Sequence, residues 1–241
     1  KTAYEIKECD WSSDVCSSDL RDPRGAWAPS RLSYFGLGYN TRLVPKDQAP
    51  KSYADLLDPR WKGKLAWRVG TATGTPLFLA NLRLAWGEDR ANAYFDKLKT
   101  QNVINFGAGS ARTLVDRVIA GEFAMAMNVF AHHPLISKAK GAPVDTALLD
   151  PVPSTSAEVI LPKGVKRPHA AMLLVDFILS KEGQEIMAKA EYYPARPDVA
   201  PLEHVASVVP ARAGVPENYI TPEKLYSYVE SSEAIWKEKF R

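Results

Sequence analysis

Two stretches of the chain repeat one pattern, in which a short apolar strand runs through a loop of small residues into a helix. Residues 64–69 lead through the loop 70–75 into a helix predicted over 76–86, and residues 103–120 repeat this order. Short strands alternate with helices of about ten residues as far as residue 190, which is typical of α/β architecture. We therefore predict an α/β fold with substantially parallel sheets.

Residues 1–20 show neither helical nor strand periodicity and hold both cysteines, Cys9 and Cys16. Read as codons, they match the translation of an indexed sequencing adapter, so we expect them to lie outside the fold. The alternative is a polar N-terminal arm with a Cys9–Cys16 disulfide. Without this segment the formal net charge rises from +3 to +6, because two basic and five acidic residues leave with it.

The remaining sequence excludes several classes of function. It contains no run of about five like charges, so we expect no nucleic-acid partner and no membrane-surface tail. No stretch of about eighteen apolar residues could form a membrane span. The absence of cysteine fits an oxidising compartment. No Gly-x-Ser-x-Gly, Walker-type loop, His-Glu-x-x-His or cysteine nucleophile indicates a familiar enzyme site.

The segment 34–67 predicts a series of short elements. A buried strand ends in a turn after Asn40, and a short helix begins at Ser52. Asp58-Pro59 stops this helix, because the residue before a proline is pushed out of the helical region. A second strand follows. The order predicts a crossover between two parts of the molecule.

Several strings in this order resemble the substrate-binding proteins of bacterial ABC transporters, in the group that includes the ferric-ion binders. They are the segment 34–67, Gly-Glu-Phe-Ala-Met-Ala at 121–126, Ser-Lys-Glu-Gly-Gln at 180–184 and Pro-Ala-Arg-Pro at 194–197. The likeness covers about residues 32–199. It implies a periplasmic binding protein-like fold of type II, with two α/β lobes that are joined by crossover strands and close by a hinge on ligand in the cleft between them.

The resemblance also implies a division of the chain and a cellular setting. The expected parts are an adapter segment at 1–20, a remnant of the first lobe and its crossover at 21–38, a second lobe at 39–153, a return to the first lobe at 154–200 and a C-terminal helical segment at 201–241. The first lobe is expected to be incomplete, and the export signal to be lost with the missing N-terminus. The implied protein is a periplasmic monomer whose partner is an ABC permease of the inner membrane.

The two strand–loop–helix junctions carry the main candidate ligand-binding residues. The first offers Thr71, Thr73, Gly74 and Thr75, with Thr75 as the expected N-cap of the helix at 76–86. The free N–H groups and positive dipole end of such a helix favour an oxyanion or carboxylate. The second junction offers Gly109, Ser110 and Arg112, whose guanidinium could grip the same kind of group. The alternative is ordinary helix capping with a solvent-facing arginine.

Asn128 lies where the ferric-binding members show an asparagine followed by two adjacent tyrosines. Phe130 and Ala131 replace the tyrosines, so the usual phenolate iron site is not expected. His132 and His133 are candidate metal ligands, although adjacent residues at a helix start point in different directions. The alternative is one packed and one solvated imidazole.

Two further candidates stay open between roles. Tyr39 is either a cleft residue or part of the core, and Arg196 is either a ligand contact or a hinge salt bridge. Both lie in segments that carry the resemblance.

These features predict a solute-binding component of an ABC importer, with no enzyme activity and no resident cofactor. Its ligand is expected to be a metal ion with a synergistic anion, an oxyanion or a small carboxylate. The alternative is a transferase-like α/β enzyme that holds a phosphorylated substrate at Ser110 and Arg112. A third reading is that the truncated chain binds nothing.

Overall fold

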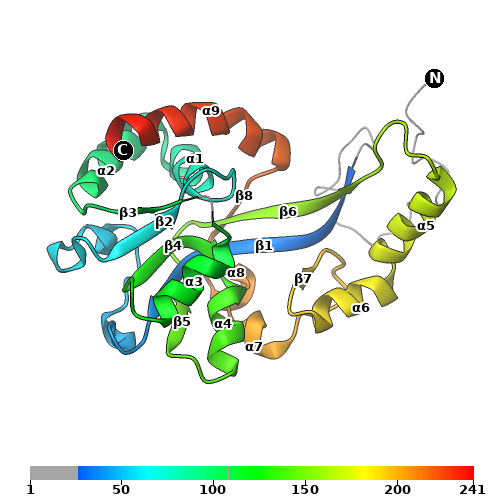
Figure 1. The fold of residues 1–241 in the computed structure, drawn as a ribbon, viewed down its shortest axis with the longest axis horizontal. Coiled ribbons are helices and arrows are strands. Elements are labelled where there is room, and N and C mark those ends of the chain that lie inside the picture. Colours follow the sequence, from blue (N-terminus) through cyan, green and yellow to red (C-terminus); the bar gives the residue numbers. More distant parts are fainter. Residues whose placement is uncertain (1–26, 108) are drawn as a thin grey trace. The chain divides into compact units, whose positions relative to one another are not determined.

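The computed structural model describes residues 27–107 and 109–241, so the expected adapter segment at 1–20 lies outside the described residues. Contacts between Cα atoms divide the chain into two compact units. Among the described residues, the small unit comprises 27–33 and 155–203, and the large unit comprises 34–154 and 204–241. Strands β1 (Trp27–Asn40) and β6 (Val152–Ile160) contribute residues to both units (Figure 1).

The sheet of the large unit is mixed. Strand β2 (Leu65–Arg68) pairs in parallel with β3 (Ile104–Phe106) and β4 (Met125–Phe130). Strand β1 pairs antiparallel with β4 and with β5 (Val144–Ala147). The prediction of substantially parallel sheets holds for β3-β2-β4, and the antiparallel direction of β1 adds to it, because that direction depends on residues far apart in the sequence.

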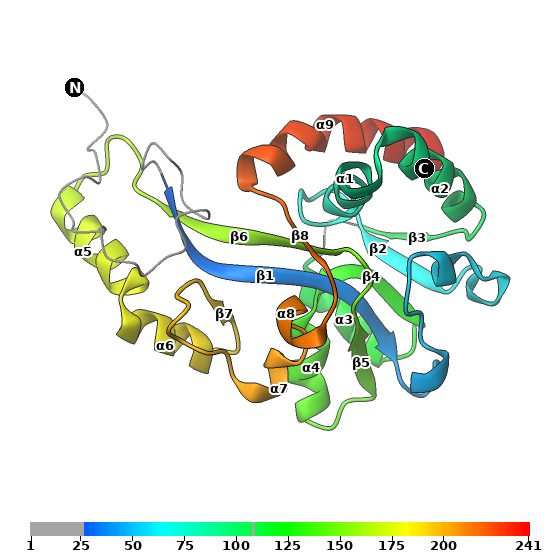
Figure 2. The same cartoon turned by 180° about the vertical axis from the view of Figure 1, so that it is seen from behind.

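Helices cover both faces of this sheet, as both views show (Figures 1 and 2). On one face lie α1 (Thr75–Trp86), α2 (Glu88–Lys99) and α9 (Pro222–Lys239), and on the other lie α3 (Ala111–Ile119) and α4 (His132–Ala139). The alternation of β2 sets this division. Trp67 packs with Phe78 and Phe95 of the first layer, whereas Ala66 packs with Leu114 of the second.

The predicted short helix after Ser52 is a 3-10 helix. The Asp55 amide donates to Ser52 Oγ at 3.2 Å, and the Ser52 amide donates to Asp55 Oδ2 at 3.0 Å, which is a capping box. The 3-10 helices of this region are η3 (Lys46–Gln48), η4 (Ala54–Leu57) and η5 (Pro59–Trp61). The Asp58-Pro59 break lies between η4 and η5, as predicted.

The small unit is organised around a buried glutamine. Gln184 Nε2 donates to Ser30 O at 2.8 Å and to Ile178 O at 2.9 Å, while Gln184 Oε1 accepts from the Ala195 amide at 2.7 Å. These bonds join β1 to α5 (Pro168–Leu179) and to β7 (Tyr193–Pro194), which pairs with β1. Ser180 caps α6 (Lys181–Lys189), because its hydroxyl accepts from the Gly183 amide at 3.1 Å.

Residues 204–241 belong to the large unit. Helix α9 packs on α1, where Arg83 Nη1 donates to Ser231 Oγ at 2.9 Å and the Arg83 guanidinium lies 4.7 Å from the ring centre of Tyr228. Three short elements before α9 are not predicted by the sequence: α7 (Glu203–Ala206), α8 (Pro210–Ala213) and β8 (Glu217–Tyr219), which pairs with β6. In the described part of the chain, every helix is too short or too polar to cross a membrane.

Candidate functional site

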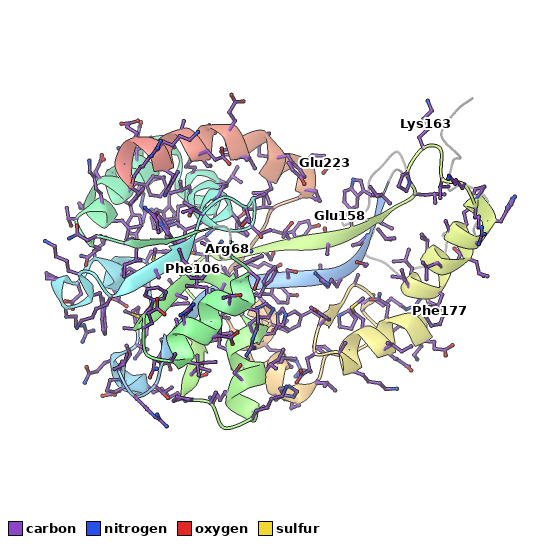
Figure 3. All side chains as sticks on the ribbon, in the orientation of Figure 1. Arg68, Phe106, Glu158, Lys163, Phe177 and Glu223 are labelled. Atoms are coloured by element: carbon purple, nitrogen blue, oxygen red, sulfur yellow. The ribbon has the colours of Figure 1, made fainter. Side chains whose placement is uncertain are left out.

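A row of side chains marks the carboxyl ends of the three parallel strands. Arg68 at the end of β2 pairs in register with Phe106 at the end of β3, and Figure 3 labels both. Asn128 on β4 follows Met127, which pairs with Trp67, so it is the next position beside Arg68. Open α/β sheets bind ligands outside the carboxyl ends of their strands. We refer to Arg68, Asn128 and the loop 70–75 as the carboxyl-edge site.

The Arg68 side chain is buried, and no described residue gives it a counter-charge. The residue is 8% exposed, and its Nη2 donates to Thr73 Oγ1 at 2.8 Å. Its buried Nε has no acceptor among the described residues, and none of their carboxylates forms an ion pair with it. Burial lowers the pKa of Arg68 from its ordinary value, since desolvation disfavours the charged form. A buried cation of this kind favours an anionic neighbour.

The loop 70–75 folds back onto the strand that precedes it. Thr75 Oγ1 donates to Arg68 O at 2.9 Å, and the Gly74 amide donates to Thr71 O at 3.0 Å. A Cβ atom at Gly74 would lie only 2.3 Å from Arg68 O, so this close approach requires glycine. The Thr71 hydroxyl is buried with no partner among the described residues.

The start of α1 differs from the prediction. Thr75 is the first helical residue rather than the N-cap, because its hydroxyl donates to the strand carbonyl instead of accepting from the helix. Gly74 holds the N-cap position, and no described side chain caps this end. The first N–H groups of a helix lack intrahelical acceptors. At this helix start Pro76 has no N–H, and the Leu77 and Phe78 amides already donate to Ala72 O and Gly74 O at 3.0 and 3.3 Å. The Thr75 N–H is thus the one donor of the first turn without a described acceptor, and it is suited to an anion beside Arg68 and Thr73.

Asn128 holds the loop in place. Its Nδ2 donates to Thr73 O at 3.0 Å and to Gly74 O at 2.9 Å. Its backbone is left-handed, with φ of 53°, a conformation that asparagine adopts more readily than most residues. The predicted candidate thus lies in the site, where its amide nitrogen positions the loop.

The second predicted junction is capped by its own residues. Ser110 Oγ accepts from the Thr113 amide at 3.0 Å and so caps α3, which is the role that the sequence left as the alternative. Gly109 passes close to the Phe106 ring, whose Cε1 would lie 2.7 Å from an added Cβ. In contrast to the start of α1, this helix start already has a side-chain acceptor.

Arg112 is engaged within the protein. Its Nη2 lies 3.0 Å from Asp116 Oδ1 and donates to Ser137 Oγ at 2.6 Å, and its Nη1 donates to His133 O at 3.1 Å. The side chain is 41% exposed. These bonds tie α3 to α4 and balance the charge, so an anion at Arg112 would compete with Asp116.

Phe130, His132 and His133 form one ring cluster at the start of α4. The Phe130 ring centre lies 4.7 Å from that of Phe35 and 5.1 Å from that of His133, and the two imidazole centres are 4.6 Å apart. In residues 27–107 and 109–241, no group of three or more His, Cys, Asp or Glu side chains gathers as a metal site would require. The imidazoles are thus a pair that packs on aromatic rings.

Tyr39 is part of the core of the large unit. It is 2% exposed and pairs with Met125, the first residue of β4, whereas Asn128 lies near the end of that strand. Burial, with a smaller contribution from Asp145, raises the pKa of Tyr39 to about 12. The structure therefore does not bring Tyr39 together with the carboxyl-edge site.

Arg196 belongs to the small unit. Its Nε and Nη2 donate to the two carboxylate oxygens of Asp198 at 2.9 and 3.0 Å. The hydrogen bond from Arg196 lowers the pKa of the Asp198 carboxyl below its ordinary value. Of the two predicted roles, the described contact is a salt bridge, formed with a residue two positions along the chain.

Residues 5–225 match the family model described as bacterial extracellular solute-binding protein. The chain belongs to this family. A putative 2-aminoethylphosphonate-binding periplasmic protein of Salmonella typhi is 27% identical over 227 residues, which are 89% of this chain and 65% of that protein. The chain spans between 46% and 65% of the length of the curated relatives that it matches first.

Solved structures show the same fold as this solute-binding protein. The periplasmic binding protein AfuA from Actinobacillus pleuropneumoniae, with fructose-6-phosphate bound, has a TM-score of 0.74 at 22% identity over 92% of this chain and 73% of AfuA. Iron-bound HitA from Pseudomonas aeruginosa has a TM-score of 0.67 at 22% identity over 93% of this chain and 72% of HitA. The predicted family and the type II periplasmic binding protein fold are confirmed.

Sequence reasoning missed Arg68 in this solute-binding protein. A single arginine at the end of an apolar strand is usually exposed, and nothing local distinguishes Arg68 from such a residue. The available signal is its position, since Leu-Ala-Trp-Arg at 65–68 runs directly into the loop 70–75. Its burial depends on Thr73 and on the register with β3, neither of which a local pattern supplies.

Proposed function

We propose that this chain is the solute-binding component of an ABC importer, located in the periplasm, which captures a small solute and delivers it to a membrane permease. Membership of the solute-binding family supports this role. The observation that carries it is the start of α1 at the carboxyl end of β2, where the Thr75 N–H, Arg68 Nε and the Thr71 hydroxyl have no partner among the described residues. We propose that the protein acts as a monomer, without enzyme activity, resident cofactor or nucleic-acid partner.

The names of two similar proteins indicate a class of solute. One is named for 2-aminoethylphosphonate and the other holds fructose-6-phosphate, and both compounds carry a phosphorus oxyanion. A solute with such a group fits the donor-rich carboxyl-edge site. A metal ion with a synergistic anion, as the iron-bound HitA structure suggests, is less well supported by the described residues, which gather no metal-ligand cluster beyond the histidine pair.

The transferase alternative is not favoured. It needs the arginine at the second junction to hold a phosphorylated substrate, and Arg112 is already paired with Asp116, Ser137 and the His133 carbonyl. The family match also points to binding rather than turnover.

Isothermal titration calorimetry on the 241-residue chain tests the proposal. The solutes are 2-aminoethylphosphonate, fructose 6-phosphate, inorganic phosphate, citrate, and ferric ion with phosphate. We expect saturable binding of at least one solute, and nuclear magnetic resonance of the recovered solute should show it unchanged. Consumption of a solute, or no heat with any of them, would overturn the proposal.

A further inference from the structure

Arg68 differs from the other arginines of the large unit. It is the one buried arginine among the described residues. Other arginines of this unit pair with a carboxylate and are balanced within the protein: Arg60, Arg83, Arg112 and Arg117. Arg68 has a hydroxyl as its one side-chain partner in the described chain, and its buried Nε is unpaired. Burying a charged group without a counter-ion destabilises a protein, so the site requires another explanation than folding.

The surroundings of Arg68 supply donors rather than acceptors. The buried Thr71 hydroxyl has no partner in the described chain, and the first turn of α1 has no described side-chain cap. The nearby carbonyl oxygens of Arg68, Thr73 and Gly74 already accept hydrogen bonds. The group that completes this site must therefore accept several hydrogen bonds and carry negative charge.

We propose that Arg68 recognises the head group of the solute and that this head group is a phosphoryl or phosphonyl group. Its three oxygens can accept from Arg68 Nε, from the Thr71 hydroxyl and from the Thr75 N–H at the start of α1, whereas a carboxylate has only two oxygens for these three donors. The inference rests on the proposed function and adds the residue that sets the specificity.

The test compares three probes on the full chain by calorimetry. 2-Aminoethylphosphonate carries the proposed head group, β-alanine replaces it by a carboxylate, and inorganic phosphate is the head group alone. We expect the phosphonate and phosphate to bind and β-alanine to bind at least about 10-fold more weakly, the lower end of what hydrogen bonds to charged groups contribute.

Variants of Arg68 separate recognition from structure. Arg68→Met should lower the affinity for the phosphonate and for phosphate by about 10- to 100-fold. Arg68→Lys keeps the charge but loses Nε, so its affinity should lie between those of the wild type and Arg68→Met. Arg90→Met is the matched control, since Arg90 is exposed on α2 and should leave binding unchanged. The thermal midpoint of unliganded Arg68→Met should equal or exceed that of the wild type, because the variant removes a buried charge that has no counter-ion among the described residues.

Four outcomes are decisive. Unchanged binding of phosphate by Arg68→Met overturns the inference. A lower unliganded midpoint together with weaker binding also overturns it, because Arg68 would then be structural. Saturable binding of citrate alone leaves the proposed function standing and overturns the assignment of the head group. No binding of any solute by the wild type overturns both.

Discussion

Asn128 and Gly74 together give the loop 70–75 its conformation. The Asn128 amide reaches two successive carbonyls of the loop, and Gly74 lets the loop pass against the Arg68 carbonyl. Both residues act on the backbone rather than through a reactive side chain. The carboxyl-edge site therefore depends on loop geometry that single substitutions can test.

Gly74→Ala should destabilise the protein by about 1–3 kcal/mol, since the new methyl group forces the loop away from the Arg68 carbonyl. Urea unfolding followed by circular dichroism measures this change. Gly107→Ala is the matched control at the second junction, because a Cβ there meets no described atom within 4 Å and should change stability by less than about 0.5 kcal/mol. Equal effects of the two substitutions would contradict the close approach.

Asn128→Ala should destabilise the protein by about 2–4 kcal/mol, because it removes two hydrogen bonds, leaves the Thr73 carbonyl without a described donor and strains a left-handed backbone. Asn128→Gly loses the same two hydrogen bonds but tolerates the positive φ. Asn128→Gly should therefore destabilise the protein by about 1 kcal/mol less than Asn128→Ala does. Urea unfolding of both variants measures the difference, and a glycine variant less stable than the alanine variant would refute the assignment of strain.

Sequence patterns predicted the candidate site only in part, and the reason lies in the range of each interaction. The Ser110 cap is local, since its hydroxyl accepts from an amide three residues on, and capping was one of the two alternatives that the sequence offered. The different use of Thr75 depends on a carbonyl at Arg68, seven residues earlier, across a turn. The role of Asn128 depends on a loop 54 and 55 residues away. No periodicity contains such pairings.

Among the elements, local signals again decided what could be predicted. The starts of α6 and α9 rest on local caps, because the Ser180 and Thr221 hydroxyls each accept from an amide three residues further along the chain. The 3-10 form of η4 and the short β8 were not predicted. β8 is only three residues long and is defined by its pairing with β6, which no local pattern shows.

Helix α9 completes the core of the large unit. The Trp236 indole donates to Asn105 Oδ1 at 3.1 Å and packs on the core, and it lines a cavity of about 300 Å³ with Gly70, Pro76 and other residues. The Phe240 ring lies 4.7 Å from that of Trp67, which is fully buried. The C-terminal helix thus shields part of the sheet that carries the carboxyl-edge site.

Trp236→Ala should destabilise the protein by about 2–3 kcal/mol, near the lower end for large-to-small substitutions because the indole is only partly buried. Tyr226→Ala on the same helix is the control, since Tyr226 is 72% exposed and its loss should cost less than about 0.5 kcal/mol. Guanidinium unfolding followed by circular dichroism compares them. A neutral Trp236 variant would show that α9 is not needed to cover the core.

Across the large unit, buried tyrosines predict a loss of stability at alkaline pH. Burial raises the pKa values of Tyr34, Tyr53 and Tyr94, and raises that of Tyr39 to about 12 from 10.0. The unfolded chain ionises near pH 10, while the folded chain keeps these phenols neutral. Their contribution to stability is therefore fully present below pH 10 and is lost as the pH rises through the folded values.

The urea concentration at the midpoint of unfolding, measured between pH 8 and pH 11.5, tests the direction of this pH dependence. Stability should fall with pH above about 10. Tyr39→Phe should make that fall less steep, because it removes one group whose proton uptake differs between the folded and unfolded states. Tyr226→Phe, which changes an exposed residue, should leave the slope unchanged. Identical slopes for the wild type and Tyr39→Phe would contradict the buried state of this phenol.

The small unit differs from the large one in how its apolar residues are placed. Helix α5 fully buries none of its side chains among the described residues, and Leu173 and Leu174 are 70% and 58% exposed. An exposed apolar face of this kind indicates a surface that contacts other molecules or favours association.

Leu173→Lys should therefore change the free energy of unfolding by less than about 0.5 kcal/mol, because no apolar area is removed from the core. The same variant should bind less of the dye 8-anilinonaphthalene-1-sulfonate. Ala188→Lys on α6 is the contrasting variant, since Ala188 is 6% exposed and a buried lysine should lower the midpoint clearly. Equal destabilisation by the two lysines would show that protein covers the α5 face.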